Sequence, residues 1–154
     1  MAGLQSLGTL RAPALGSRAM ADMPPVVAVF NTSEDTTDML RVLLENAGFV
    51  VVSAFTNRLR DGTTDFEALM RQHRPQVIVY DVAIPYDQNW RLFQHFRGSP
   101  ACHDVTFVVT TTHAGHVRKI AGEETVIHEI VGKPYDLDEI LRAVRDAIRN
   151  RPGR

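Results

Sequence analysis

Short apolar runs rich in β-branched and aromatic residues alternate with segments of helical periodicity from Val26 onward, and this alternation limits the possible folds more than any other feature. The runs cover residues 26–30, 49–54, 77–80, 105–110 and 126–131. The first, third and fourth are almost continuously apolar, as expected of strands buried on both faces of a parallel sheet. The fifth contains His128 and Glu129, which is typical of an edge strand.

The segments between these runs carry apolar residues at helical spacing and predict five helices. Their apolar stripes cover residues 39–47, 66–73, 90–96, 117–121 and 137–148. Residues 32–35 form a capping-box-like start for the first helix, Thr64 is the expected start of the second, and Asp136 is the expected N-cap of the last. Residues 61–64 are expected to lie in a loop after the second strand.

Five β–α units within about 125 residues imply a parallel sheet with helices on both faces, because parallel neighbours need right-handed crossovers. At this length we predict an α/β, flavodoxin-like, doubly wound fold with a five-stranded parallel sheet in the order 2-1-3-4-5. Function in such folds gathers at the carboxyl ends of the strands. The residues that end each strand are therefore the first candidates for a site.

Composition excludes several classes of protein. Seventeen basic and eighteen acidic residues leave a net charge of −1, whereas wrapping nucleic acid or binding a membrane electrostatically requires a surface of one sign. The single cysteine, Cys102, excludes an internal disulfide and a multi-cysteine metal centre, which fits a reducing, cytoplasmic compartment. No apolar run reaches the roughly 20 residues that span a bilayer. We expect neither nucleic acid nor a membrane as a direct partner.

The ends of the chain differ in character from its middle. Residues 1–24 are rich in Ala, Gly, Ser and Leu, and we interpret them as a disordered leader or as sequence upstream of a true start at Met20 or Met23. Residues 25–150 form the expected folded domain, and 151–154 a short tail. No segment of output-domain size follows the last predicted helix, so output is expected through protein contacts.

Chemically distinctive residues stand where the predicted strands end. Asn31 and Thr32 follow the first strand, Asp81 the third, Thr110 and Thr111 the fourth, and Lys133 the fifth. Taken singly, each is a common turn, strand or surface residue. Lys133, however, is one of only two lysines in the chain. Together these positions predict a carboxylate, a hydroxyl and an ammonium group at one edge of the sheet.

Three motifs carry a resemblance to a known family. They are VIVYDVAIP at residues 77–85, FVVTT at 107–111 and VGKPYD at 131–136. Thr110 lies 29 positions after Asp81, and Lys133 lies 52 positions after it. With these motifs on five β–α units, residues 25–150 resemble the receiver domain of two-component response regulators, whose fold is CheY-like.

The resemblance implies that Asp81 is a phosphoacceptor that takes a phosphoryl group from a histidine kinase or a phosphotransfer protein. It implies that Lys133 and Thr110 contact the phosphoryl oxygens, and that the bond between Lys133 and Pro134 is cis. Such a domain signals to a downstream protein and is not an enzyme beyond self-catalysed phosphotransfer and dephosphorylation.

The sequence departs from the family at the metal site. The acidic pair that helps receivers to hold Mg²⁺ falls on Asn31 and Thr32, neither of which is a carboxylate. The implied ligands are then Asn31, Asp81 and the backbone of Ala83, which is a weakened site for a hard cation. Glu34 and Asp35 fit the first turn of a helix better than a metal site.

Two further departures lie on the fourth and fifth strands. Thr111 replaces the small residue usual in the family, which predicts narrower access to the site, and Ile130 replaces the usual switch aromatic. The chain is then either a phosphorylated receiver with poor metal assistance or a phosphorylation-independent pseudo-receiver that acts as a protein-interaction module.

The family also indicates a partner surface around the fourth helix, the fifth strand and the fifth helix. On this chain it includes His116, Arg118, His128, Tyr135 and Arg142. A homodimer through the same face is compatible with the resemblance.

A competing class is a flavodoxin-like enzyme or ligand-binding module, which requires a deep pocket at the strand ends. His113 and His116 are interpreted as surface histidines rather than metal ligands.

Overall fold

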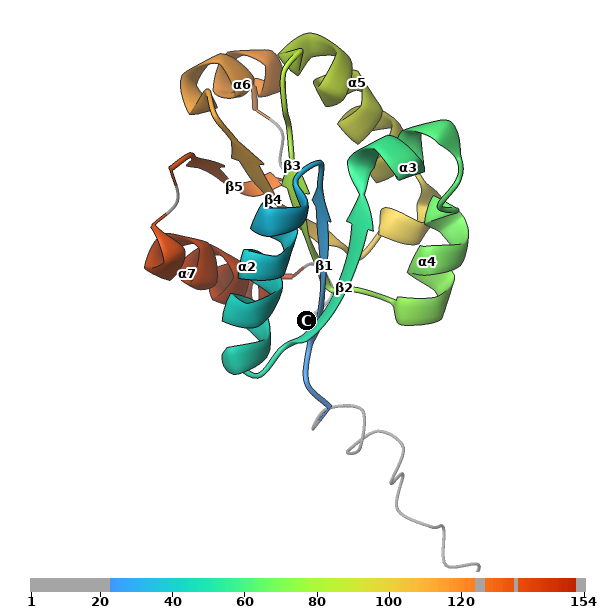
Figure 1. The fold of residues 1–154 in the computed structure, drawn as a ribbon, viewed down its shortest axis with the longest axis vertical. Helices are drawn as coiled ribbons and strands as arrows, with labels where there is room; N and C mark the ends of the chain where they lie inside the picture. Colours follow the sequence, from blue (N-terminus) through green and yellow to red (C-terminus); the bar gives the residue numbers. More distant parts are fainter. Residues whose placement is uncertain (1–22, 124–126, 135, 152–154) are drawn as a thin grey trace, which may run out of the picture.

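The computed structural model describes residues 23–123, 127–134 and 136–151. Its five strands form one parallel sheet in the order β2-β1-β3-β4-β5 (Figure 1). The strands are β1 (Val26–Asn31), β2 (Val50–Phe55), β3 (Val77–Asp81), β4 (Thr106–Thr111) and β5 (Ile127–Gly132). The predicted topology is confirmed. The predicted leader and tail lie almost entirely outside the described residues.

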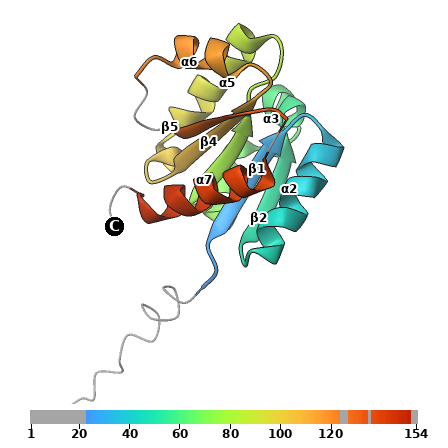
Figure 2. The same ribbon diagram turned by 90° about the vertical axis from the view of Figure 1, so that its left-hand side faces the viewer.

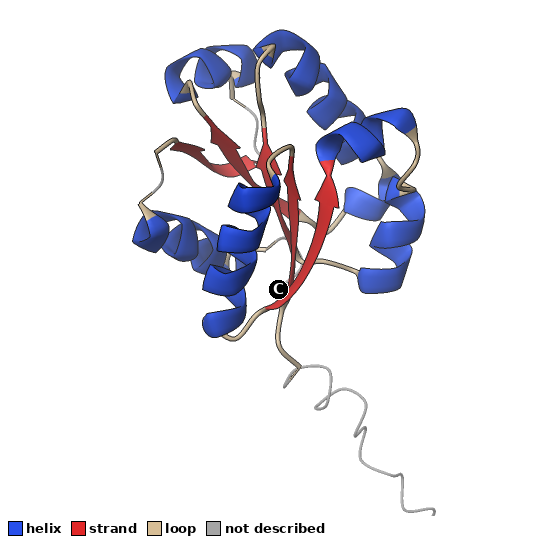
Figure 3. Cartoon of the chain, in the orientation of Figure 1, coloured by secondary structure: helices blue, strands red, loops and turns tan. Residues whose placement is uncertain are grey.

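Helices cover both faces of this sheet (Figure 3). They are α2 (Glu34–Asn46), α3 (Thr56–Asp61), α4 (Phe66–His73), α5 (Tyr86–Arg97), α6 (Ala114–Ala121) and α7 (Leu137–Arg149), with a short 3-10 helix η1 (Pro100–Cys102) before β4. Figures 1 and 2 show α2 and α7 beside each other on one side of the sheet. None of the helices within the described ranges is long and apolar enough to cross a membrane.

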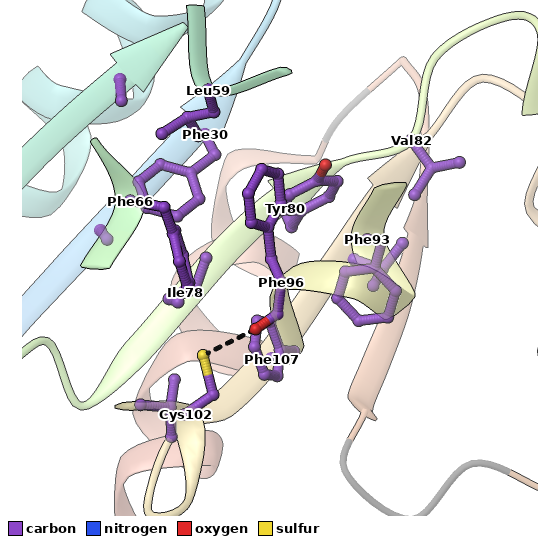
Figure 4. Packing of buried hydrophobic residues seen from close by; sticks show 14 of the residues in the cluster. Phe30, Leu59, Phe66, Ile78, Tyr80, Val82, Phe93, Phe96, Cys102 and Phe107 are labelled. Carbon is purple, nitrogen blue, oxygen red and sulfur yellow. Dashed lines mark hydrogen bonds between the residues drawn. The ribbon is translucent and has the colours of Figure 1, made fainter. Parts of the chain in front are cut away.

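Each face of the sheet has its own apolar core. Leu40 and Leu44 of α2 pack with Ile140 and Val144 of α7 against one face. The other core is aromatic and gathers side chains of α3, α4, α5, η1 and α6 (Figure 4). In it, Phe66 and Phe96 lie 4.6 Å apart between ring centroids. Burial of such large rings is a main contribution to stability in a domain of this size.

Helix α3 corrects the sequence-based prediction. Five helices were expected, and the described residues form six α-helices, because residues 56–61 are helical where only a connection to the predicted loop was expected. This helix buries Thr56 and Leu59, and six residues are too few to show a periodic apolar stripe. Gly62 ends it with a φ of 80°, a left-handed conformation that glycine adopts readily.

Side chains cap the starts of α2, α4 and α7, whereas α3 and α5 begin without a side-chain cap. Ser33, which lies within the capping sequence predicted for α2, accepts a hydrogen bond from the amide of Thr36, and Asp136 accepts one from the amide of Asp138, as predicted for α7. The predicted start at Thr64 is wrong by one position. Asp65 is the N-cap of α4, and its carboxylate accepts a bond of 3.1 Å from the amide of Ala68. Adjacent Thr and Asp are both good caps, so the sequence alone does not separate them.

Candidate functional site

Strand pairing brings the predicted site residues to one edge of the sheet. Asp81 at the end of β3 is the register partner of Thr110 on β4, and Thr111 is the partner of Gly132 on β5. Lys133 follows immediately and donates its amide to the carbonyl of Thr111 at 2.8 Å. The arrowheads of β1 and β2 in Figure 1 point to this edge.

The side chains of Asp81, Thr110 and Lys133 meet there. Oγ1 of Thr110 donates to Oδ1 of Asp81 at 2.8 Å, and Nζ of Lys133 lies 2.9 Å from the same oxygen. Asp81 is only 2% exposed, and the Lys133 side chain is 23% exposed. A buried carboxylate needs such a charged partner and a hydrogen-bond donor, because burial removes its hydration. The peptide bond between Lys133 and Pro134 is cis.

The side chain of Thr111 bonds to the backbone next to the Asp81 carboxylate. Its buried hydroxyl donates to the carbonyl of Val82 at 2.8 Å, and the amide of Val82 donates to the carbonyl of Thr110 at 2.8 Å. The chain that leaves β3 is therefore bonded to β4 through both backbone and side chain. The sequence singled out Thr111 only as a larger residue near the site, because a side-chain bond to a distant carbonyl leaves no sequence pattern.

The oxygens predicted for a metal ion already have partners within the protein. Oδ1 of Asn31 accepts a bond of 2.9 Å from the amide of Ser33, at the start of α2. The carbonyl of Ala83 accepts one of 2.8 Å from Nδ2 of Asn89. Asp81 is the sole carboxylate of the predicted set, and the described part of the chain holds no group of three or more His, Cys, Asp or Glu suited to a metal. This donor set does not fit Mg²⁺ well, since that ion favours carboxylates in near-octahedral geometry.

Asn89 and Arg60 are site neighbours that the sequence did not reveal. Asn89, on α5, is 4% exposed, and its Oδ1 accepts a hydrogen bond from Nη2 of Arg60 on α3. A polar residue beside Trp90, on the buried side of a helix, was the one available signal for Asn89. Arg60 carried none.

The described residues expected on the partner surface each contact a neighbouring residue of β5 or α5. Nη2 of Arg118 donates to the carbonyl of Ile130 at 3.1 Å, and Nη2 of Arg142 lies 3.4 Å from Oε1 of Glu129. His116 lies 3.6 Å from Asp87 of α5. Tyr135 and the side chain of His128 lie outside what the structure describes.

The remaining candidate residues have structural positions. Nδ1 of His113 accepts a bond of 3.0 Å from the amide of His116, which caps α6. Cys102 is buried against the aromatic core, and burial raises the pKa of its thiol to about 12. One surface hollow is lined by Phe66, Phe96 and Ser99, among others, and another by Phe49, Arg145 and their neighbours, both away from Asp81.

Comparison with curated proteins gives two remote similarities. The chain is 25% identical over 119 residues to an uncharacterized 14.6 kDa protein in the sodA1 3' region of Leptolyngbya boryana, covering 77% of this chain and 86% of that protein. It is 26% identical over 125 residues to the DNA-binding dual master transcriptional regulator RpaA of Synechocystis sp.. That match covers 81% of this chain and 49% of the regulator, so the chain spans about half of RpaA. No protein-family model matches the chain.

Solved structures match over most of the chain. A response regulator from Thermotoga maritima superposes with a TM-score of 0.64 at 21% identity, covering 82% of this chain and 99% of that one. The chemotaxis protein CheY4 of Vibrio cholerae gives 0.64 at 20% identity, covering 80% and 98%. A signal receiver domain from Clostridium thermocellum gives 0.66 at 13% identity, covering 81% and 98%. With its strand order and its residues at the strand ends, this chain has the fold of the response regulator receiver domains.

Proposed function

We propose that this protein is a receiver domain that accepts a phosphoryl group on Asp81 from a histidine kinase or a phosphotransfer protein. The observation that carries the proposal is the meeting of three side chains at the strand ends, with Thr110 and Lys133 both on one oxygen of Asp81. The receiver fold supports it, since ligands and reactions of doubly wound sheets lie at this edge.

The proposed reaction needs only positioning and charge neutralisation. A carboxylate oxygen of Asp81 forms a bond to phosphorus while the bond from phosphorus to the donor's histidine nitrogen breaks, and the electron pair of that bond stays on the nitrogen. The other ring nitrogen takes up a proton from solvent before the transfer, so the products are an acyl phosphate on Asp81 and a neutral histidine. The transferred group brings additional negative charge to the site. The ammonium of Lys133 then pairs with a phosphoryl oxygen as a compact point charge, and the hydroxyl of Thr110 donates a hydrogen bond to another.

Output is proposed to pass through protein contacts on the surface formed by α6, β5 and α7. Strand β5 pairs with β4, which carries Thr110, so a shift of that side chain acts next to this surface. His116, Arg118 and Arg142 present cationic or titratable groups there to a downstream protein or to a second copy of the chain.

Phosphorylation is tested with acetyl phosphate as the small-molecule donor and intact mass spectrometry as the readout. We expect wild type to gain the mass of one phosphoryl group and Asp81→Asn to gain none. Asp87→Asn, which removes an exposed carboxylate at the start of α5, is the matched control and should be phosphorylated like wild type. Lys133→Met should be phosphorylated at least about tenfold more slowly, because it removes a charge-assisted contact to the transferred group.

The phosphorylation-independent alternative predicts a different result. In that case no adduct forms on wild type with or without Mg²⁺, and partner binding survives in Asp81→Asn. An adduct that persists in Asp81→Asn would place the acceptor elsewhere and overturn the assignment of Asp81.

A further inference from the structure

The loop that leaves β3 is connected to α3 through two consecutive side-chain hydrogen bonds. Nδ2 of Asn89 donates to the carbonyl of Ala83 at 2.8 Å, and Oδ1 of Asn89 accepts from Nη2 of Arg60. Asn89 is 4% exposed, and both polar ends of its amide have hydrogen-bond partners. A buried amide that lost either partner would carry the penalty of an unsatisfied polar group. The Arg60–Asn89–Ala83 relay is therefore built into the packing.

This relay occupies a backbone oxygen that the family resemblance assigns to the metal ion. The two other implied ligands also have partners within the protein, since Oδ1 of Asn31 accepts from Ser33, and Oδ1 of Asp81 accepts from Thr110 and faces Lys133. A magnesium ion would have to share or displace these donors to reach its preferred geometry.

The positive side chains near the loop also disfavour the binding of a metal cation. The ammonium of Lys133 lies 2.9 Å from Asp81, and the guanidinium of Arg60 bonds to Asn89. Burial raises the pKa of the Tyr80 hydroxyl, the charge of Arg60 lowers it and the charge of Asp81 raises it, so both charges act at the end of β3. A divalent ion placed among these groups would meet two positive side chains and one carboxylate.

We propose that the Arg60–Asn89–Ala83 relay takes the structural place of the divalent ion, so that the loop beside Asp81 is held in shape without Mg²⁺. Arg60 and Asn89 are positioning residues in this proposal, since they act on the loop through the Ala83 carbonyl. The proposal rests on the proposed function only in treating Asp81 as the centre of the site.

The first test is a Mg²⁺ titration of the full chain, with calorimetry and tryptophan fluorescence as the two readouts. Trp90 is the only tryptophan in the sequence, is buried and follows Asn89 directly, so its emission reports on this loop. We expect wild type to show no saturable heat and no change of emission up to millimolar Mg²⁺. Saturable binding at sub-millimolar Mg²⁺, with a change in Trp90 emission, would overturn the proposal.

The second test is amide hydrogen exchange at residues 82–84 in two relay variants and a control. Asn89→Ala removes both bonds of the relay, and Arg60→Gln removes the guanidinium from an exposed side chain, where the risk of unfolding is small. Arg58→Gln removes the same charge from an exposed position of the same helix, outside the relay.

We expect exchange at residues 82–84 to rise roughly tenfold in the relay variants and to stay at the wild-type rate in the control. Wild-type exchange rates in both relay variants would overturn the proposal, and so would slowing of wild-type exchange by Mg²⁺. Neither measurement involves phosphorylation, so its failure is distinguishable from a failure of Asp81 to accept a phosphoryl group.

Discussion

At the scale of single residues, one oxygen of Asp81 concentrates the interactions of the site. It accepts the hydroxyl of Thr110 and faces the ammonium of Lys133, while the carboxylate is 2% exposed. The ion pair mainly offsets the cost of removing the buried carboxylate from water and contributes little net stability to the fold. Removing the charge of one partner should therefore lower the free energy of unfolding more than removing both charges together.

Replacing Lys133 by methionine tests this asymmetry. We expect Lys133→Met to lower the free energy of unfolding by about 1–3 kcal/mol, because the Asp81 carboxylate stays buried with its cation removed. The double variant Lys133→Met/Asp81→Asn should regain much of this loss, measured by urea unfolding at neutral pH. Lys119→Met, which changes the other lysine at an exposed position of α6, should stay within about 0.5 kcal/mol of wild type. A double variant no more stable than Lys133→Met alone would contradict this account.

The buried thiol of Cys102 should make the free energy of unfolding depend on pH in the alkaline range. Burial, with a smaller effect from Glu67, raises the pKa of this thiol from 9.0 to about 12 in the folded chain. Between these values the unfolded chain releases a proton that the folded chain keeps, so the free energy of unfolding falls as the pH rises from 9 to 12. Urea unfolding at pH 8 and pH 10 should show a smaller loss for Cys102→Ala than for wild type. Tyr80 titrates in both proteins, so equal losses in the two would show that Cys102 has no such effect.

At the scale of the secondary-structure elements, α3 has the greatest consequence for the site. It is a six-residue helix that contributes Leu59 to the aromatic core and Arg60 to the relay. A helix this short has too few internal hydrogen bonds to be stable alone, so tertiary packing and its terminal glycine hold it in place. The end of α3 should therefore be sensitive to substitution.

A pair of glycine variants tests this sensitivity. Gly62→Ala places a Cβ at a φ of 80°, and we expect it to lower the free energy of unfolding by about 1 kcal/mol. Gly115→Ala lies within α6 at an exposed position with open space around its Cβ, and it should raise that free energy by about 0.5–1 kcal/mol. Thermal or urea unfolding of both variants measures the difference. Changes of the same sign at the two positions would contradict the conformational argument.

At the scale of the whole molecule, two cores share one sheet. Each central strand places alternate side chains in the two cores, as Ile78 and Val79 of β3 do. Loss of packing on one face should therefore weaken the other face as well, and the domain should unfold in one cooperative step.

Truncations on opposite faces test this cooperativity. We expect Phe93→Ala to lower the free energy of unfolding by about 3–5 kcal/mol and Ile140→Ala by about 2–5 kcal/mol, since both side chains are fully buried. In each variant, Trp90 fluorescence and far-UV circular dichroism should give the same urea midpoint. Separate midpoints for the two probes would show that the two faces unfold independently.

Much of this molecule was predictable because its local signals agree. Apolar runs predicted the strands, and their alternation with helical stripes, together with the length of the domain, predicted the doubly wound fold and its strand order. Asp81, Thr110 and Lys133 were identifiable because each ends a predicted strand, and parallel strand ends meet at one edge. Helix α3 was missed because its two buried residues are too few to define a period.

The amino-acid sequence by itself determined the order of strands and helices and the kinds of side chain at the carboxyl ends of the strands, because periodicity records which face of a segment is buried. Tertiary structure decided which atoms meet. The relay from Arg60 to Asn89 joins residues 29 positions apart, and the hydroxyl of Thr111 reaches Val82 from another strand. A hydrogen bond is sensitive to changes of a few tenths of an ångström in the distance between donor and acceptor. Only the packing of whole elements against one another fixes such distances that closely.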